Sequence, residues 1–289
     1  MSKIRVEHLT HIYSAGTPFE KVALDDVSVE IRQGELIGII GHTGSGKSTF
    51  LQHLNGLLRP DSGTVSLDGA DINASKELLR AVRFRVGLVF QYPEYQLFEE
   101  TVFRDISFGP RNMGLGEEEI RERVLEAASF VGVSPDWMEG SPLELSGGQK
   151  RRVAIAGVIA MRPEVLILDE PTAGLDPVGR ESILQNILDY RAGTGATVML
   201  VSHSMDDVAR LAERLLVFHR GKIVMDGPPA AVFERAGELK EMGLTVPAAT
   251  EIALALRARG VEIPDSIYTT KYLQKLLLAR LAGEEERPC

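Results

Sequence analysis

The distribution of hydrophobic and polar residues along the chain predicts two kinds of β-strand. Residues 4–7 and 27–31 alternate apolar and polar side chains, which is typical of antiparallel strands with one buried face. Four later runs are almost wholly apolar, as expected of strands covered on both faces. These runs are 36–40, 86–90, 165–168 and 198–201. Helical segments separate them, so we expect an α/β fold with a parallel-sheet core and an antiparallel β subdomain.

Between residues 92 and 162 the apolar spacing becomes helical. After the acidic segment 117–119, apolar side chains recur every three or four residues, as on the buried face of a helix. The positions are Ile120, Val124, Ala127, Ala128 and Val131. Residues 151–161 form a second candidate helix, ended by Pro163. We therefore expect a helical subdomain over about 92–162, inserted into the sheet.

The pattern changes again after residue 217. Residues 217–225 resemble a hairpin that turns at Gly221. Helical signals follow over 247–259 and 269–282, with Leu273, Leu276, Leu277 and Leu281 on one side of the second helix. We divide the chain into a main domain of residues 1–236 and a C-terminal helical extension of residues 237–289. The extension is too short for a self-sufficient core, so it is expected to pack on the main domain or on a partner.

A glycine-rich segment directly after the apolar run 36–40 carries the first chemical signal. It reads Gly-His-Thr-Gly-Ser-Gly-Lys-Ser-Thr, the G-x-x-x-x-G-K-S pattern of a phosphate-binding loop. Glycines let backbone N–H groups face a phosphate, and the following helix points its positive dipole end at the same place. A glycine-rich turn with an unrelated lysine would not need a strand before it and a helix after it. The predicted nucleotide-binding residues are Gly41, His42, Thr43, Gly44, Ser45, Gly46, Lys47, Ser48 and Thr49.

Two of these residues have side chains with distinct tasks. Lys47 is placed to reach the β- and γ-phosphates, and Ser48 to offer its hydroxyl to Mg²⁺. The segment therefore predicts that the chain binds a nucleoside triphosphate together with Mg²⁺.

Composition narrows the class of partner. The 289 residues carry 41 acidic and 32 basic side chains, a net charge of −9, which argues against nucleic acid as the main partner. The single cysteine, Cys289, leaves no intrachain disulfide. The sequence has no secretory signal pattern and no apolar run approaching about 18 residues. We expect a cytosolic chain, or one that docks on a membrane through another protein.

Further motifs occur in a fixed order. They are Leu-Ser-Gly-Gly-Gln at 145–149, Val-Leu-Ile-Leu-Asp-Glu at 165–170, Gly-Leu-Asp at 174–176, and His203. With the phosphate-binding loop, this order resembles the nucleotide-binding subunit of ATP-binding-cassette (ABC) transporters over residues 3 to 235. The resemblance implies the ABC form of the P-loop NTPase fold and identifies the nucleotide as ATP.

Acidic and polar residues follow the predicted strands at their carboxyl ends, where open α/β sheets bind ligands. Asp169 can hold Mg²⁺ through water, and Glu170 can act as the general base for the attacking water. The alternative is that Asp169 and Glu170 only cap a helix after the strand, but Pro171 makes an immediate helix less favourable. The resemblance assigns His203 to the γ-phosphate and water, and Gln91 to sensing of Mg²⁺ and of the membrane partner.

The Leu-Ser-Gly-Gly-Gln motif predicts a second anion-binding helix start, since Ser146, Gly147 and Gly148 precede a helix beginning near Gln149. A simple N-cap at Ser146 is the alternative. The resemblance implies that this motif grips the γ-phosphate bound to the opposite subunit, and that Asp176 crosses to that subunit. One complete site then needs two chains.

Tyr13 ends the first predicted strand. It resembles the aromatic residue that stacks on adenine in these proteins. A core tyrosine is the alternative, with Phe19 as the nearest substitute.

Two segments indicate which group of ABC transporter ATPases the chain resembles. Residues 91–110 and 16–26 are similar to energy-coupling factor (ECF) ATPases, specifically the second of two paralogues. Such ATPases pair with a paralogous ATPase or a second copy, a transmembrane coupling protein, and a small membrane protein that binds a vitamin or metal ion. Residues 92–108 combine aromatics with acidic residues, which predicts a groove for an arginine-bearing helix; a solvated acidic face is the alternative. The acidic residues are Glu94, Glu99, Glu100 and Asp105.

The resemblance implies an ATP-hydrolysing motor at the cytoplasmic face of the cell membrane, peripheral to it. The homodimeric ATPase of a cobalt or nickel importer is a second interpretation. A soluble ABC ATPase acting on DNA or ribosomes is a third, but this sequence has neither a second cassette nor a long coiled-coil insertion. A non-hydrolysing clamp conflicts with the presence of Glu170 and His203.

Overall fold

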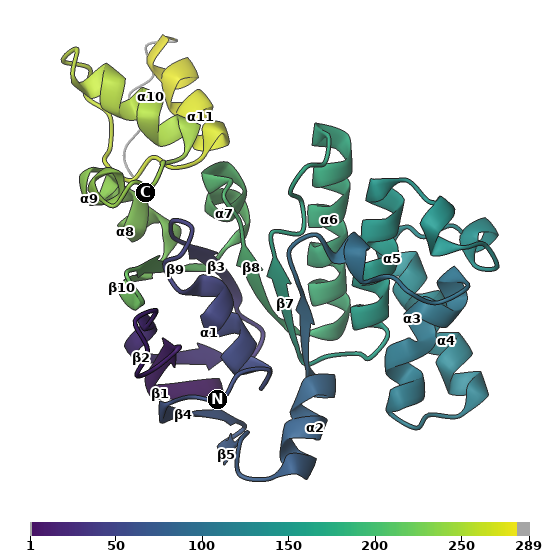
Figure 1. Ribbon diagram of the computed structural model, residues 1–289. Coiled ribbons are helices and arrows are strands. Elements are labelled where there is room, and N and C mark those ends of the chain that lie inside the picture. The colour runs from purple at the N-terminus through teal and green to yellow at the C-terminus, as the bar shows by residue number, and fades with distance from the viewer. Residues whose placement is uncertain (1, 282–289) are drawn as a thin grey trace.

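The computed structural model describes residues 2–281 as two sheets flanked by helices (Figure 1). Cys289 lies outside the described residues. In chain order the elements are β1 Ser2–Tyr13, β2 Lys21–Arg32, β3 Leu36–Ile40, α1 Lys47–Leu54, β4 Ser62–Leu67, β5 Ala70–Asp71, α2 Lys76–Arg85, β6 Val86–Val89, η1 Pro93–Gln96, α3 Val102–Asn112, α4 Glu117–Val131, η2 Pro135–Trp137, η3 Pro142–Glu144, α5 Gly147–Ile159, β7 Val165–Asp169, α6 Pro177–Thr194, β8 Thr197–Val201, α7 Met205–Leu211, β9 Arg214–His219, β10 Lys222–Gly227, α8 Pro229–Glu234, α9 Ala236–Glu241, α10 Ala248–Arg257 and α11 Thr270–Leu281.

The central sheet has six strands in the order β10-β9-β3-β8-β7-β6. Its pairs from β9 to β6 are parallel, and β10 is antiparallel to β9. Successive residues of β3 enter different cores: Leu36 and Ile40 pack on one face, and Ile37 and Ile39 on the other. Burial on both faces explains why these strands are apolar at every position. The sequence-based expectation of a parallel core is confirmed.

A second, antiparallel sheet has the order β2-β1-β4-β5. Its apolar residues share a core with α1 and one face of the central sheet, for example Val6, Val29 and Phe50. Because only one face is covered, β2 keeps the alternating pattern that predicted it. The β1–β2 hairpin places Tyr13 opposite Lys21, at the edge nearest the phosphate-binding loop.

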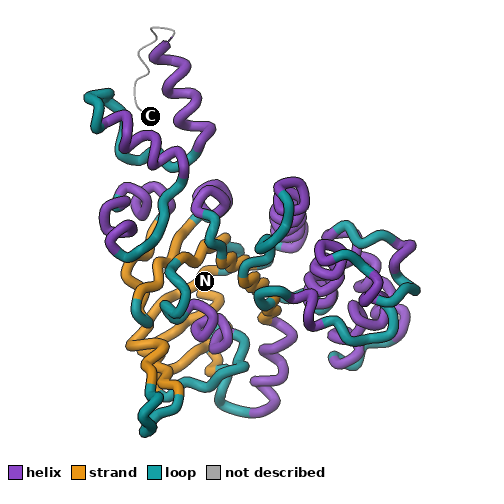
Figure 2. The backbone as a smooth tube through the Cα atoms, turned by 45° about the horizontal axis from the view of Figure 1, so that its top comes forward, coloured by secondary structure: helices purple, strands orange, loops and turns teal. Residues whose placement is uncertain are grey.

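The segment from η1 to α5 forms a helical lobe beside the sheets, which the two views show from different directions (Figures 1 and 2). The five apolar positions predicted for its longest helix, Ile120, Val124, Ala127, Ala128 and Val131, are all buried. The α5 helix begins at Gly147, before residues 149 and 151, where the two sequence patterns place its start, because Ser146 already caps it. The inserted helical lobe is confirmed.

The C-terminal helices lie far from the helical lobe in both views (Figures 1 and 2). The hairpin turns at Gly221, whose φ of 78° suits glycine. Helices α10 and α11 enclose a small core of their own, formed by Ala249, Ala253, Ile263, Ile267 and Leu273. Leu281 is exposed, so the predicted apolar side of α11 does not extend to its end. Within residues 2–281, the helices are all too short or too polar to cross a membrane.

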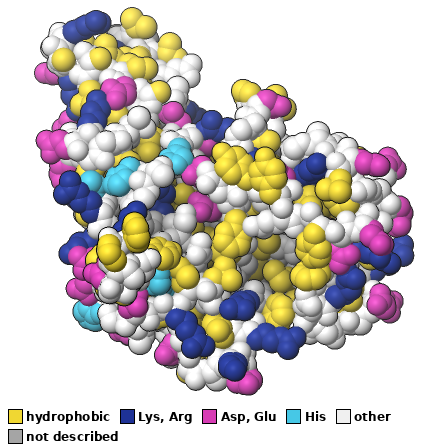
Figure 3. Space-filling view, in the orientation of Figure 1, with side chains coloured by type: hydrophobic (Ala, Val, Ile, Leu, Met, Phe, Trp, Pro, Cys, Tyr) yellow, Lys and Arg dark blue, Asp and Glu magenta, His cyan; other side chains and the backbone are white. Residues whose placement is uncertain are grey.

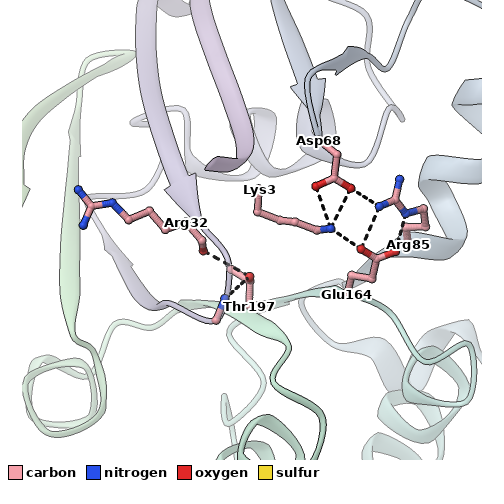
Figure 4. A network of polar contacts seen from close by, with 7 residues as sticks. Lys3, Arg32, Asp68, Arg85, Glu164 and Thr197 are labelled. Carbon is pink, nitrogen blue, oxygen red and sulfur yellow. Dashed lines mark hydrogen bonds and ion pairs between the residues drawn. The ribbon is translucent and has the colours of Figure 1, made fainter. Parts of the chain in front are cut away.

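A cluster of ion pairs connects the antiparallel sheet to the central sheet (Figure 4). Buried Lys3 contacts Asp68, in the turn between β4 and β5, and Glu164, just before β7. Arg85, at the end of α2, contacts the same two carboxylates. The Arg85 hydrogen bond, supported by Lys3, lowers the pKa of Glu164 to about 2 despite partial burial. Burial alone would raise the pKa of Asp68, but Lys3 and Arg85 lower it overall.

Candidate functional site

A cleft of about 320 Å³ opens at the carboxyl ends of the parallel strands. It brings together residues that are distant in the sequence, because β3, β7 and β8 end side by side in the sheet. The sequence-predicted residues that line it are Tyr13, Thr43, Gly44, Gly46, Lys47, Ser48, Thr49, Gln91, Asp169, Glu170 and His203. Lys21 and Ala23 also line it and were not predicted.

The loop between β3 and α1 requires glycine at two positions. A Cβ on Gly41 would lie 2.4 Å from the carbonyl oxygen of Phe218, and one on Gly46 would lie 2.6 Å from that of Ala23. Both residues also have positive φ, 154° and 107°. Any side chain would push the loop away from β9 and β2. The loop backbone is therefore fixed from behind while its other side faces the cleft.

Lys47 is a buried cation whose hydrogen bonds go to neutral groups. Its Nζ donates to the carbonyl oxygens of Gly41 at 2.6 Å and His42 at 3.1 Å. Burial lowers the pKa of Lys47, although the carboxylates of Asp169 and Glu170 oppose this shift. A buried ammonium beside a glycine loop and a helix N-terminus suits an anionic ligand such as a phosphate.

Ser48 and Asp169 supply neighbouring side-chain oxygen atoms to the same cleft. The Ser48 hydroxyl donates to Asp169 Oδ2 at 2.9 Å, and burial raises the pKa of Asp169 while this hydrogen bond opposes it. Within residues 2–281, groups of three or more His, Cys, Asp or Glu side chains suited to a metal ion are absent. Mg²⁺ is normally held by one or two protein oxygens together with substrate phosphates, so this pair fits it.

Glu170 lies between two polar side chains. Gln91 Nε2 donates to Glu170 Oε2 at 3.0 Å, and His203 Nε2 is 2.7 Å from Oε1. The backbone of Glu170 is left-handed, with φ of 53°, and its N–H donates to Val201 O at 3.1 Å. The carboxylate is thereby held at the cleft in an orientation from which it can accept a proton from water.

Tyr13 occupies the outer end of the cleft. Its hydroxyl is 3.2 Å from Thr49 Oγ1, and its ring packs edge-to-face on His11 with centroids 4.6 Å apart. Phe19 is 83% exposed and is not among the cleft residues, so Tyr13 is the better placed aromatic. Lys21 faces the same end because it pairs with Tyr13 in the hairpin. The register of that hairpin is the signal that could have identified Lys21.

The residues predicted to act across two subunits do not line this cleft. Ser146 and Gln149 form a capping box: Ser146 Oγ accepts from Gln149 N, and Gln149 Oε1 accepts from Ser146 N. Ser146 is therefore the N-cap of α5, and the contact with an opposite subunit that the resemblance implies stays a prediction. Gly147 and Gly148 form the first turn of α5, and Asp176 caps α6 through Gly179 N at 2.7 Å.

The acidic groove expected over residues 92–108 differs from the prediction. Glu94 is 14% exposed and pairs with Arg151 at 2.7 Å. Glu99 and Glu100 pair with arginines of α3. Asp105 accepts hydrogen bonds from the backbone of residues 98 and 99. An incoming arginine would have to displace contacts that the chain already makes, above all the buried pair of Glu94. Glu100 is 80% exposed, so its pair is a surface contact of small energy.

Four of the five aromatic side chains of the same segment are exposed, whereas Phe103 packs against the core. Tyr95 is 84% exposed and Phe98 65%, with Tyr92 and Phe108 also on the surface. In the space-filling view, hydrophobic side chains gather in the hollow between the sheets and the helical lobe (Figure 3). Clustered exposed aromatics are typical of a protein interface.

The fold and the cleft define an ATP-binding cassette, and a family model described as ABC transporter matches residues 24–173. The chain belongs to the ABC transporter family and, within it, to the energy-coupling factor transporter ATP-binding proteins. A relative named EcfA2 from Symbiobacterium thermophilum is 56% identical over 284 residues, 98% of this chain and 98% of its own length. EcfA2 from Clostridium tetani is 54% identical over 276 residues, covering 95% and 96%. The chain is an ATPase.

Solved structures agree with this assignment. One is cbiO1 from Clostridium perfringens, described as part of the ABC transporter complex cbiONQ. It has a TM-score of 0.73 and 39% identity over 84% of this chain and 94% of its own. Another is the cassette MJ0796, described as a dimer in a post-hydrolysis state bound to ADP and Pi. Its TM-score is 0.71 at 29% identity, over 78% of this chain and 98% of its own.

Proposed function

We propose that this chain is the ATP-hydrolysing motor subunit of an energy-coupling factor importer, working at the cytoplasmic face of the membrane. The observation that carries the proposal is the Glu170 carboxylate, held by Gln91 and His203 beside a phosphate-binding loop. The residues 1–236 form the ATP-binding domain, and residues 237–289 provide contacts to a dimer partner.

ATP binds with its phosphates on the loop from Gly41 to Thr49. Backbone N–H groups and the Lys47 ammonium hold the β- and γ-phosphates. Ser48 and Asp169 would hold Mg²⁺, assisted by Gln91, and the bound metal would neutralise charge that develops on the phosphates. Tyr13 stacks on the adenine ring.

Glu170 acts as the general base in hydrolysis. Its carboxylate accepts a proton from water as that water attacks the γ-phosphorus; the bond between this phosphorus and the oxygen bridging it to the β-phosphate breaks, so that ADP and inorganic phosphate leave. Gln91 and His203 keep both carboxylate oxygens oriented, so little reorganisation is needed at the moment of reaction. His203 is half exposed and contacts the γ-phosphate from the outer side.

A complete site forms between two chains. Ser146, Gly147, Gly148 and Gln149 stand at the start of α5, away from the cleft of their own chain. The first N–H groups of a helix have no partners within the helix, so those of α5 can bind the γ-phosphate of an opposite subunit. Asp176 at the start of α6 contacts that subunit as well.

The partners follow from this arrangement. A paralogous ATPase or a second copy completes the ATP sites, and a transmembrane coupling protein rests on the exposed aromatics of residues 92–108. A membrane protein that binds a vitamin or transition-metal ion selects the cargo. The negative net charge supports the exclusion of nucleic acid. The homodimeric ATPase of a cobalt or nickel importer is the second candidate.

The proposal is tested by purification from detergent-solubilised membranes. Mass spectrometry should identify a transmembrane subunit and a substrate-binding subunit with the chain, and the complex should hydrolyse ATP only with Mg²⁺. Lys47→Ala should weaken ATP binding because it removes a charge-assisted phosphate contact. Recovery of the chain without membrane subunits, or unchanged ATP affinity of Lys47→Ala, would contradict the proposal.

A further inference from the structure

Arg151 joins two segments that flank the cleft. It lies in α5 and is 3% exposed, which is unusual for arginine unless it is fully paired. Its Nε and Nη2 donate to the two carboxylate oxygens of Glu94 at 3.0 and 2.7 Å. Glu94 belongs to η1, three residues after Gln91. The buried bidentate pair therefore ties α5 to the segment that follows Gln91.

The third donor of the same guanidinium points to the turn that follows Glu170. Arg151 Nη1 donates to the carbonyl oxygen of Ala173 and lies 3.5 Å from that of Pro171. The N–H of Ala173 in turn donates to the carbonyl oxygen of Glu170 at 3.2 Å. Arg151 is thus connected to the backbone of Glu170, the proposed base, through Ala173 and one further hydrogen bond.

These contacts form a closed ring. Gln91 contacts the Glu170 side chain, Glu94 contacts Arg151, and Arg151 contacts the turn at Ala173. We infer that Arg151 is a positioning residue for ATP hydrolysis, which fixes the segment after Gln91 and the turn after Glu170 in one relative arrangement. The inference rests on the proposed role of Glu170 as general base.

The chemistry of arginine matters to this role. Its planar fork satisfies a carboxylate with two parallel hydrogen bonds and still presents a donor to a backbone carbonyl. Lysine has a single nitrogen and cannot bridge both groups in that geometry. Exposed Tyr92 and Tyr95 flank Glu94 on the chain. A partner that shifts these aromatics would therefore move Glu94, Arg151 and the turn carrying Glu170 together.

The test compares Arg151→Lys with a matched control, Arg123→Lys, in the full-length chain assembled with its partner ATPase. Arg123 also donates two hydrogen bonds to one carboxylate, both to Glu119 Oε1 at 3.0 and 2.7 Å, and a third to the carbonyl oxygen of Met161 at 3.3 Å. It lies in α4, and the cleft does not include it. For each variant, kcat, KM for ATP, ATP affinity and the unfolding midpoint are measured.

Arg151→Lys is expected to lower kcat by about 10-fold to 10²-fold, because small misplacements of catalytic groups have effects of this size. Its ATP affinity should stay within about twofold of wild type, since the phosphate-binding loop is untouched. Arg123→Lys should keep wild-type kcat. Wild-type kcat in Arg151→Lys would overturn the inference, as would equal losses of kcat in both variants.

A double-mutant cycle with Glu94→Gln provides an independent measurement. If Glu94 and Arg151 act as one unit, the double variant should lose no more kcat than the worse single variant. Additive losses would refute the inference. Glu170→Gln, measured alongside, distinguishes a failure of this inference from a failure of the proposed function. If Glu170→Gln is inactive and Arg151→Lys is fully active, only the role of Arg151 is contradicted. If Glu170→Gln keeps wild-type turnover, both the proposed function and this inference are contradicted.

Discussion

The side chain of Glu170 shows how the cleft prepares one residue for chemistry. It is 14% exposed, and different partners contact its two carboxylate oxygens. Asp169, its neighbour in the chain, has another environment: it is buried against the Ser48 hydroxyl. In the function proposed above, these two adjacent carboxylates have separate tasks, one toward a metal ion and the other toward water.

Replacing Glu170 with glutamine should separate binding from hydrolysis. The amide keeps the shape of the side chain but cannot accept the proton, so we expect kcat to fall by about 10²–10⁴-fold. ATP affinity should be retained, because Lys47 and the loop are unchanged. Steady-state ATPase assays and an equilibrium ATP titration check this. Wild-type turnover would show that Glu170 is not the base.

Most residues of the cleft were predictable because their signals are local. The phosphate-binding loop, Asp169 and Glu170 are recognised from spacing within a few residues of a buried strand. Lys21 required knowledge of the hairpin register, which places it opposite Tyr13. Arg151 and Glu94 are 57 positions apart, and the sequence pattern contains nothing that pairs them. For the same reason Glu94 was interpreted as part of an acidic docking face.

At the scale of secondary structure, the elements that the sequence predicts most clearly are those that bury most of their side chains. Strands buried on both faces are continuous apolar runs, and α4 shows a regular apolar face, so both were recognised. The α2 helix has one buried residue, Val82, which leaves no periodic signal. The two-residue strand β5 has none either. Elements that contribute little to the core are therefore the ones that hydrophobic patterning does not reveal.

The aromatic surface of the η1 and α3 region should bind the membrane partner. Changing Tyr95 and Phe98 together to serine removes exposed apolar area without touching buried contacts, so the fold should persist. We expect the chain to leave the membrane complex while its unfolding midpoint stays unchanged. The control is Leu125→Ser, an exposed apolar residue of α4. Co-sedimentation of the Tyr95→Ser/Phe98→Ser variant at the wild-type level would argue against this docking surface.

At the scale of the whole molecule, the ion cluster in Figure 4 makes the joint between the two sheets sensitive to acid. The pKa of Glu164 in the folded chain, about 2, lies below its ordinary value of 4.5. Its contribution is therefore complete above pH 4.5 and is lost as the pH falls toward 2. Since Glu164 is 43% exposed, screening by solvent limits the contribution to about 1 kcal/mol.

Urea denaturation at several pH values tests this statement. Wild type should lose free energy of unfolding between about pH 4.5 and pH 2 more steeply than Glu164→Gln, which has no proton to bind. Parallel curves for the two proteins would show that Glu164 does not stabilise the fold through its charge.

A composite site predicts that two inactive variants can complement each other. If the chain forms homodimers, Ser146→Arg and Lys47→Ala would each be inactive alone. In a mixed dimer one site carries both lesions and the other carries none, so random mixing should restore about a quarter of wild-type activity. Inactivity despite verified mixed dimers would show that Ser146 and Lys47 of the same chain serve one site, and would contradict a site shared between chains. With a paralogous partner, the two lesions are placed on the two different chains.

The left-handed backbone of Glu170 has a consequence for protein engineering. A non-glycine residue in this conformation costs about 1–2 kcal/mol, so the position opposes thermal stability in exchange for catalytic geometry. Glu170→Gly should therefore unfold at higher urea concentration than Glu170→Ala, although glycine is normally the more destabilising residue. The reverse order would show that the position is unstrained. A screen of Glu170 variants for heat resistance that ignores ATPase activity would thus favour glycine over alanine, although neither residue can act as a general base.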